Sequence, residues 1–252
     1  MAPRATWVWD RPAPEELLAW VVAEDVGDIF LGVGEDFESS ADAMWARVVV
    51  ELMHRHGVRV AALGGDPGWV TDTSSALAWQ RAVTATRLFD GIHLDVEVWT
   101  RPDWTTRPRP LGAAYLFLLQ HLARESPLPI EADIAFHLHE VPGDSGASLE
   151  AEVMTVVDAV TVLSYRNTVT GPDSITGVAA SALASAGNAG VPCRLAVETQ
   201  DLGADPVARK QTFHGLGKAA LDRALGEVDR DLADVPAYAG IAVHDYQHWR
   251  LL

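Results

Sequence analysis

The sequence of 252 residues is poor in cysteine and in basic side chains, and it contains no long apolar run. Its single cysteine, Cys193, excludes an intramolecular disulfide and a zinc site built on paired cysteines. Lys and Arg number 19 against 35 Asp and Glu, which gives a formal net charge of −16. Because nucleic acids and anionic membranes are bound chiefly through basic side chains, we expect this chain to bind neither.

The N-terminal residues lack the basic segment, apolar stretch and small-residue cleavage site of a secretory signal, so a cytoplasmic location is expected. No run approaches the roughly 18 to 20 apolar residues that cross a bilayer. Hydrophobic residues make up 48% of the chain and no low-complexity linker divides it. We therefore expect one domain over residues 1–252, a length at which barrels commonly form one domain.

Eight short apolar runs typical of β-strands alternate with segments that have the apolar spacing of helices. The strand candidates are Thr6–Trp9, Asp28–Val33, Arg59–Leu63, Gly91–Val96, Ile130–Phe136, Ala159–Ser164, Arg194–Glu198 and Gly240–His244. The helix candidates are Pro14–Ala23, Ala41–His56, Ser74–Leu88, Leu111–Arg124, Ser148–Val156, Ser174–Asn188 and Pro206–Leu225. This alternation predicts an α/β fold, a (β/α)8 TIM barrel. A doubly wound open sheet is the alternative, but no GxGxxG turn follows the first strand.

Polar residues follow nearly every predicted strand. They are Asp10, Glu35, Asp66, Asp95, Glu97, His137, Tyr165, Glu198, His244 and Asp245. In a parallel barrel the carboxyl ends of the strands meet at one face, where the chemistry of such folds lies. The sequence therefore predicts a functional barrel mouth.

The densest polar signal is DGIHLDVE at residues 90–97, on the fourth predicted strand. Alternation along a strand places His93, Asp95 and Glu97 on one side, with about 6.7 Å between each of them and the next. Burying Asp95 and Glu97 without partners costs several kcal/mol each, so they are expected to be paired, to share a proton or to face a pocket. Two carboxyls in proximity raise one pKa, which suits a general acid.

This motif resembles the DGxDxDxE of glycoside hydrolase family 18, the chitinase and endo-N-acetylglucosaminidase family. ALGG at residues 62–65, after the third strand, is similar to that family's SxGG, and LSY at residues 163–165 is similar to its Met-x-Tyr-Asp at the sixth strand. The resemblance implies that Glu97 protonates the glycosidic oxygen, Asp95 orients the substrate's N-acetyl group and Tyr165 hydrogen-bonds the acetamide. The acetamide oxygen would attack the anomeric carbon, and no metal or organic cofactor would be needed.

The chain departs from the family pattern at three positions. His93 stands for the first Asp of the motif, Arg166 for the Asp after the strand-six Tyr, and His244 for the Trp that ends strand eight. The short connection between strands seven and eight leaves no room for an extra domain, so a shallow pocket and a small, sugar-like ligand are expected. Two further hypotheses stay open. One is a binding barrel that has lost hydrolysis, and the other is an enzyme that carries out acid–base chemistry on a non-sugar small molecule, with proton carriers His93, Glu97, Glu198 and His244.

Further candidate binding residues lie at the other strand ends. Trp9 and Trp99 are expected to offer aromatic faces to a sugar ring, and Glu198 to face the mouth, where it could pair with Arg166. His244 and Asp245 follow strand eight and are expected to line the site. His137 and His139 form an HxH that raises a metal site with Glu198 and His244 as a weaker alternative.

Overall fold

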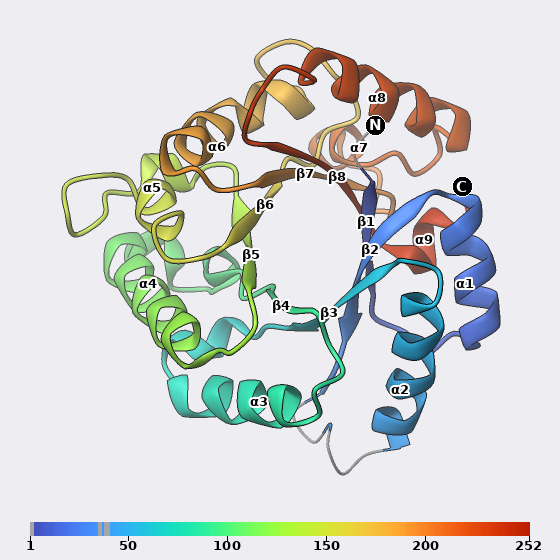
Figure 1. Ribbon diagram of the computed structural model, residues 1–252. Helices are drawn as coiled ribbons and strands as arrows, with labels where there is room; N and C mark the ends of the chain where they lie inside the picture. The colour runs from blue at the N-terminus through green and yellow to red at the C-terminus, as the bar shows by residue number, and fades with distance from the viewer. Residues whose placement is uncertain (1–2, 35–36, 38–40) are drawn as a thin grey trace.

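The computed structural model describes residues 3–34, 37 and 41–252, in which eight parallel strands close into a barrel in sequence order (Figure 1). The predicted (β/α)8 fold is confirmed. Glu35, one of the polar residues predicted to follow a strand, lies outside the described residues. The strands are β1 (Arg4–Val8), β2 (Val26–Gly32), β3 (Arg59–Gly64), β4 (Gly91–Leu94), β5 (Ile130–Ala135), β6 (Ala159–Leu163), β7 (Cys193–Glu198) and β8 (Tyr238–His244). Closure is completed by β1, which pairs in parallel with both β2 and β8.

Helices surround the barrel on its outside (Figure 1). They are α1 (Pro14–Ala23), α2 (Ala41–His54), α3 (Thr73–Ala85), α4 (Pro108–Glu125), α5 (Leu149–Val153), α6 (Ile175–Ala189), α7 (Pro206–Gln211), α8 (Lys218–Asp231) and α9 (Tyr246–Trp249). The prediction of a single helix over 206–225 is wrong, because two separate helices, α7 and α8, cover this range. Gly215 and Gly217 have φ angles of 77° and 80° between α7 and α8, a conformation that interrupts a right-handed helix.

Alternation along the strands separates two apolar layers. One layer packs between strands and helices and includes Ile92 and Leu94, while a smaller cluster inside the barrel includes Trp7 and Phe30. His93 faces this interior, where its ring stacks on Phe30 with centroids 3.6 Å apart. His93 therefore lies on the inner side of β4, and Ile92 and Leu94 lie on its outer side, as the sequence predicts.

The fourth strand ends earlier than predicted, at Leu94 instead of Val96. The backbone N–H of Asp95 still donates to Gly64, with an N···O distance of 3.0 Å, but Glu97 adopts a left-handed conformation with φ 43° and ψ 50°. The tight turn, and not strand alternation, therefore directs the Glu97 side chain. Gly65 allows the close approach, because a Cβ there would lie 1.9 Å from the Asp95 carbonyl oxygen.

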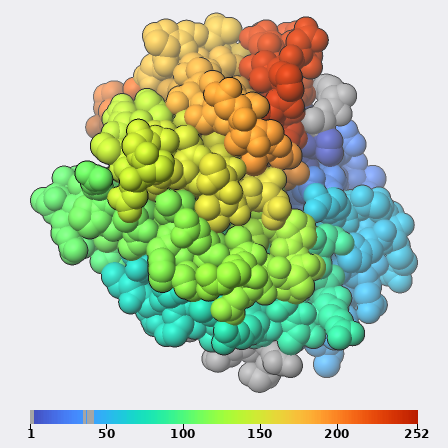
Figure 2. Space-filling view, turned by 60° about the vertical axis from the view of Figure 1, so that its left-hand side comes forward, coloured from blue at the N-terminus to red at the C-terminus, as the bar shows by residue number. Residues whose placement is uncertain are grey.

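The outer surface is formed by the helices and their connections. Figure 2 shows green, yellow and orange segments of the chain packed against one another on one face of the molecule. Among the described residues, no helix combines the length and the apolar character that a membrane span requires.

Candidate active site

Asp95 and Glu97 lie together at the C-terminal end of the barrel, and both side chains are half-buried. Burial, followed by the charge of Asp133, raises the pKa of Asp95 to about 7. Burial, followed by the charge of Asp95, raises the pKa of Glu97 to about 7, although His244 and a hydrogen bond from Trp99 act in the opposite direction. Both carboxyls therefore exist as a mixture of protonated and ionised forms near neutral pH.

A third carboxyl, Asp133 on β5, completes this group and is fully buried. Its Oδ2 accepts hydrogen bonds from Trp7 Nε1 at 3.2 Å and from His93 Nε2 at 3.0 Å. Its carboxyl is also the hydrogen-bond neighbour of Asp95. The sequence analysis overlooked Asp133, although the alternation of Glu131 and Asp133 with small and apolar neighbours in the fifth strand carried the signal.

His93 is an uncharged ring inside the barrel. Burial lowers its pKa to about 4, despite the nearby carboxylates of Glu131 and Asp95. We assign the proton of the neutral ring to Nε2, 3.0 Å from Asp133 Oδ2, because Nδ1 lies 4.0 Å from the Glu131 oxygen, too far to donate to it. At neutral pH His93 therefore acts as a fixed donor to Asp133 and adds no positive charge to the mouth.

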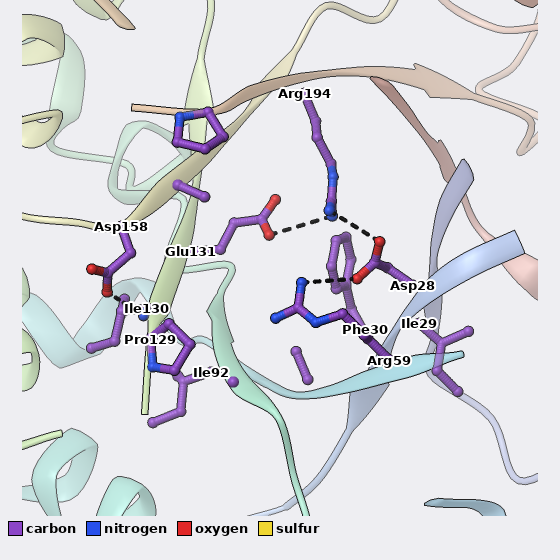
Figure 3. Close-up of a pocket in the computed structure, with 14 residues that line it drawn as sticks. Asp28, Ile29, Phe30, Arg59, Ile92, Pro129, Ile130, Glu131, Asp158 and Arg194 are labelled. Atoms are coloured by element: carbon purple, nitrogen blue, oxygen red, sulfur yellow. Dashed lines mark hydrogen bonds and ion pairs between the residues drawn. The ribbon is translucent and has the colours of Figure 1, made fainter. Parts of the chain in front are cut away.

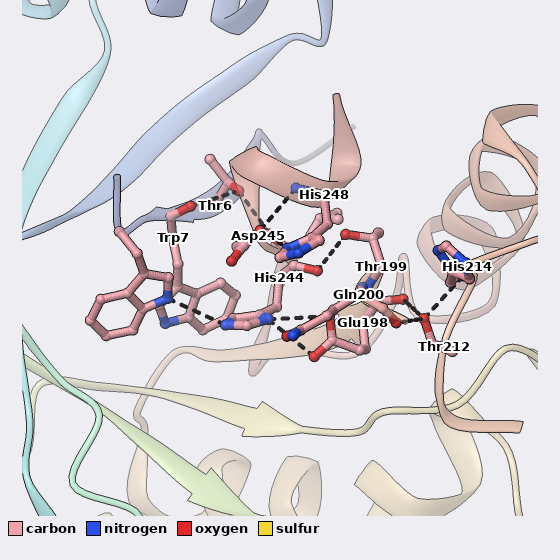
Figure 4. A network of polar contacts seen from close by, with 12 residues as sticks. Thr6, Trp7, Glu198, Thr199, Gln200, Thr212, His214, His244, Asp245 and His248 are labelled. Atoms are coloured by element: carbon pink, nitrogen blue, oxygen red, sulfur yellow. Dashed lines mark hydrogen bonds and ion pairs between the residues drawn. The ribbon is translucent and has the colours of Figure 1, made fainter. Parts of the chain in front are cut away.

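His244 and Glu198 form a second pair of ionisable groups, at the ends of β8 and β7 (Figure 4). His244 Nδ1 lies 3.0 and 3.2 Å from the two Glu198 oxygens. Burial lowers the pKa of His244, but the hydrogen bond and the charge of Glu198 outweigh it and raise the pKa to about 9. The ring is therefore a cation at neutral pH. The 3.3 Å contact in which Trp9 Nε1 donates to His244 Nε2 belongs to the deprotonated form, because a protonated Nε2 cannot accept.

Three aromatic residues accompany these groups at the mouth. Trp9 keeps 40% of its surface exposed, Trp99 is half-buried beside Glu97, and the Tyr165 ring lies 6.1 Å from the His244 ring. Burial and the charge of Glu198 raise the pKa of Tyr165 well above its usual value, so its hydroxyl stays protonated. The mouth thus offers aromatic faces together with a neutral hydroxyl donor.

Arg166 is directed to the neighbouring loop. Its Nε donates to Asp173 at 2.6 Å, a terminal nitrogen donates to the Tyr165 carbonyl oxygen at 2.7 Å, and the guanidinium lies 5.0 Å over the Phe136 ring. Arg166 is only 6% exposed. Glu198, which the sequence analysis considered as a partner for Arg166, is paired with His244 instead.

Asp245 and His137 lie beside the site without joining the carboxyl group. Asp245 is buried and caps α9, accepting from the His248 backbone N–H at 3.0 Å and contacting its Nδ1 at 2.7 Å. His137 is half-buried after β5, where burial lowers its pKa and Phe136 contacts its ring. Within the part of the chain that the structure describes, no three His, Cys, Asp or Glu side chains are grouped to hold a metal ion.

The cavities that lie away from these carboxyls include two that charged side chains line. One of about 220 Å³ opens at the N-terminal ends of the strands, where Arg194 bridges Asp28 at 3.1 Å and Glu131 at 3.4 Å (Figure 3). These ion pairs close the opposite end of the barrel from Asp95. Another, of about 410 Å³, is lined by residues of the segment that follows β7, including Asp201, Arg209 and His214.

Comparison with solved structures shows which proteins share this barrel. A chitinase of glycoside hydrolase family 18 from Pseudoalteromonas aurantia superposes with a TM-score of 0.60 at 14% identity, over 97% of this chain and 94% of that one. The fold is that of the family 18 chitinases. A class V chitinase mutant from Cycas revoluta in complex with (GlcNAc)3 gives a TM-score of 0.61 at 12% identity, covering 98% and 96% of the two chains.

The Bacillus cereus spore cortex-lytic enzyme SleL also has this fold, with a TM-score of 0.57 at 14% identity, over 99% of this chain and 73% of that one. No model of a protein family matches the sequence, and no curated protein matches it either. The likeness is therefore one of fold, and it agrees with the resemblance that the fourth-strand motif and the two shorter motifs carry.

Proposed function

We propose that this chain is a glycoside-hydrolase-like enzyme that acts on a small N-acetylated sugar or glycoside, with Glu97 as its general acid. The observation that carries the proposal is the position of Glu97 at the barrel mouth, half-buried beside Asp95, with burial and that neighbouring charge raising its pKa to about 7. A carboxyl with such a pKa is still partly protonated at neutral pH, as donation to a glycosidic oxygen requires.

Asp95 is assigned to the substrate's acetamide. In substrate-assisted hydrolysis the acetamide oxygen attacks the anomeric carbon while the leaving group takes a proton from the acid. Asp95, next to Glu97, would accept the acetamide N–H and stabilise the positive charge that develops on this group. The protonated hydroxyl of Tyr165 would donate to the acetamide oxygen, and the exposed face of Trp9 would pack on a sugar ring.

The comparisons support a sugar ligand at the level of the fold. Two of the similar structures, both of Cycas revoluta chitinase variants, were solved in complex with GlcNAc oligosaccharides. The replacement of a strand-eight Trp by His244 removes a stacking surface and sets a cation against Glu198. We therefore expect short ligands to bind better than long polymers.

The test is hydrolysis of aryl N-acetylglucosaminides and short chito-oligosaccharides by the wild type, by Glu97→Gln and by Glu140→Gln. Glu140 is a matched control, because it is an exposed Glu near the end of β5. Glu97→Gln should lower kcat by about 10²- to 10⁴-fold, the usual contribution of a general acid, and Glu140→Gln should leave it unchanged. Equal turnover by the wild type and Glu97→Gln would remove Glu97 from this role.

A second candidate function is a sugar-binding barrel without hydrolysis. It is favoured by the loss of the strand-eight Trp and by Arg166, whose charge is held by Asp173 beside the predicted site. Calorimetry with N-acetylglucosamine oligomers separates the two: binding without detectable turnover supports this candidate, and robust hydrolysis eliminates it.

A further inference from the structure

The carboxyl of Asp133 has one oxygen that is fully satisfied and one that is not. Oδ2 accepts from both Trp7 and His93, whereas the buried Oδ1 has no N–H or hydroxyl donor from the described residues. The Asp95 carboxyl is the remaining neighbour, because the parallel register that pairs His93 with Glu131 and Leu94 with Ala132 brings Asp95 beside Asp133. Since a buried acceptor without a donor is costly, Oδ1 is satisfied only when one proton is held between the two carboxyls.

The two donors also decide on which side this proton rests. Trp7 has no exposed surface, and His93 is held by stacking on Phe30, so both N–H groups are fixed in their direction. Because Oδ2 already accepts from two fixed donors, the proton lies at the other oxygen, Oδ1. Burial raises the pKa of Asp133 well above its usual value, so the shared proton rests mainly on Asp133, which donates it to Asp95.

We propose that Asp133 is the positioning residue that orients the Asp95 carboxyl and holds its proton for the reaction at Glu97. The part played in the reaction rests on the proposed function, whereas the coupling of the two carboxyls does not. Asp133 lies on β5. It gives Asp95 a carboxyl partner, which residue 93 of β4 does not provide because it is a histidine. His93 takes a different part, as the donor that fixes Asp133.

Other charged or titratable groups face this pair from several elements. They are His93 on β4, Glu97 in the turn after it, Glu131 on β5, Tyr165 after β6, His244 on β8 and Tyr115 on α4, whose hydroxyl donates to the Asp133 carbonyl oxygen. Of these groups, Tyr115 and Tyr165 stay neutral through the neutral range, because burial raises the pKa of each. The ionisation of Asp95 is therefore expected to follow chiefly Asp133, with smaller effects from Glu97, Glu131 and His244.

The test is a carbon-13 carboxyl NMR titration of the aspartates in the full chain. In the wild type the Asp95 and Asp133 curves should each show two steps with shared midpoints, as coupled carboxyls do. In Asp133→Asn the Asp95 curve should become a single step, with its midpoint lower by about 1 pH unit or more, because a like charge is replaced by an amide donor. The control is Asp229→Asn, which removes another buried carboxylate, one that is ion-paired with Arg4 at 2.7 Å.

Independent single-step curves for Asp95 and Asp133 in the wild type would overturn the proposal, and this result needs no variant to fold. An Asp95 midpoint that is the same in Asp133→Asn as in the wild type would also overturn it. If sugar hydrolysis is found, the acid limb of kcat/KM should move down with the Asp95 midpoint in Asp133→Asn and stay in place in Asp229→Asn. If the wild type shows coupled titration but hydrolyses no sugar, the proposed function is refuted, whereas the coupling of the two carboxyls stands.

Discussion

Replacing His244 by Gln should make the stability of the protein depend less on pH. The pKa of His244 is raised to about 9 in the folded chain by Glu198, which outweighs the effect of burial, against 6.5 for a free histidine. At 1.36 kcal/mol per pH unit, this difference contributes about 3 kcal/mol to the free energy of unfolding. Because the folded pKa is the higher one, this stabilisation is fully present below pH 6.5 and is lost as the pH rises through 9.

Urea unfolding at pH 6 and at pH 10 measures this contribution. The wild type should exceed His244→Gln in the free energy of unfolding by about 3 kcal/mol more at pH 6 than at pH 10. Taking the difference between the two proteins cancels the titration of groups that both retain. His214→Gln, which removes an exposed histidine, serves as the control and should show no such change. A difference between wild type and His244→Gln that is equal at both pH values would refute the charged pair.

Three further predictions concern the carboxyls and their surroundings. Because burial and a neighbouring charge raise the pKa of Glu97 to about 7, kcat/KM on an aryl N-acetylglucosaminide should fall above pH 7; a flat profile to pH 9 would contradict its role as acid. Gly65→Ala should cost about 1–3 kcal/mol in urea unfolding, because its Cβ would meet a backbone oxygen, whereas Gly34→Ala has open space and should change nothing; equal midpoints would disprove the close approach. Trp7→Phe should cost about 1–3 kcal/mol in urea unfolding, because it removes one of the two donors to the buried Asp133 Oδ2; an unchanged midpoint would contradict this.

The barrel, and the end of it at which the polar strand ends gather, could be predicted from the amino-acid sequence alone. Strand and helix signals are local, because alternation and helical spacing depend only on neighbouring residues, and eight such units in order specify a parallel barrel. The same local signal placed His93 on the inner side of β4 and Ile92 on the outer side. The fourth-strand motif and its position also led to the fold that the solved chitinases share.

Which side chains contact one another at the barrel mouth could not be predicted, because these contacts join residues that are far apart in the sequence. Asp133 and Asp95 are 38 positions apart, and no local pattern shows that closure of β4 against β5 makes them share a hydrogen bond. The left-handed turn at Glu97 and the pairing of Glu198 with His244 likewise depend on how separate strand ends come together. Hydrogen bonding and burial at the mouth are properties of the closed barrel, and they set the pKa values on which the proposed chemistry depends.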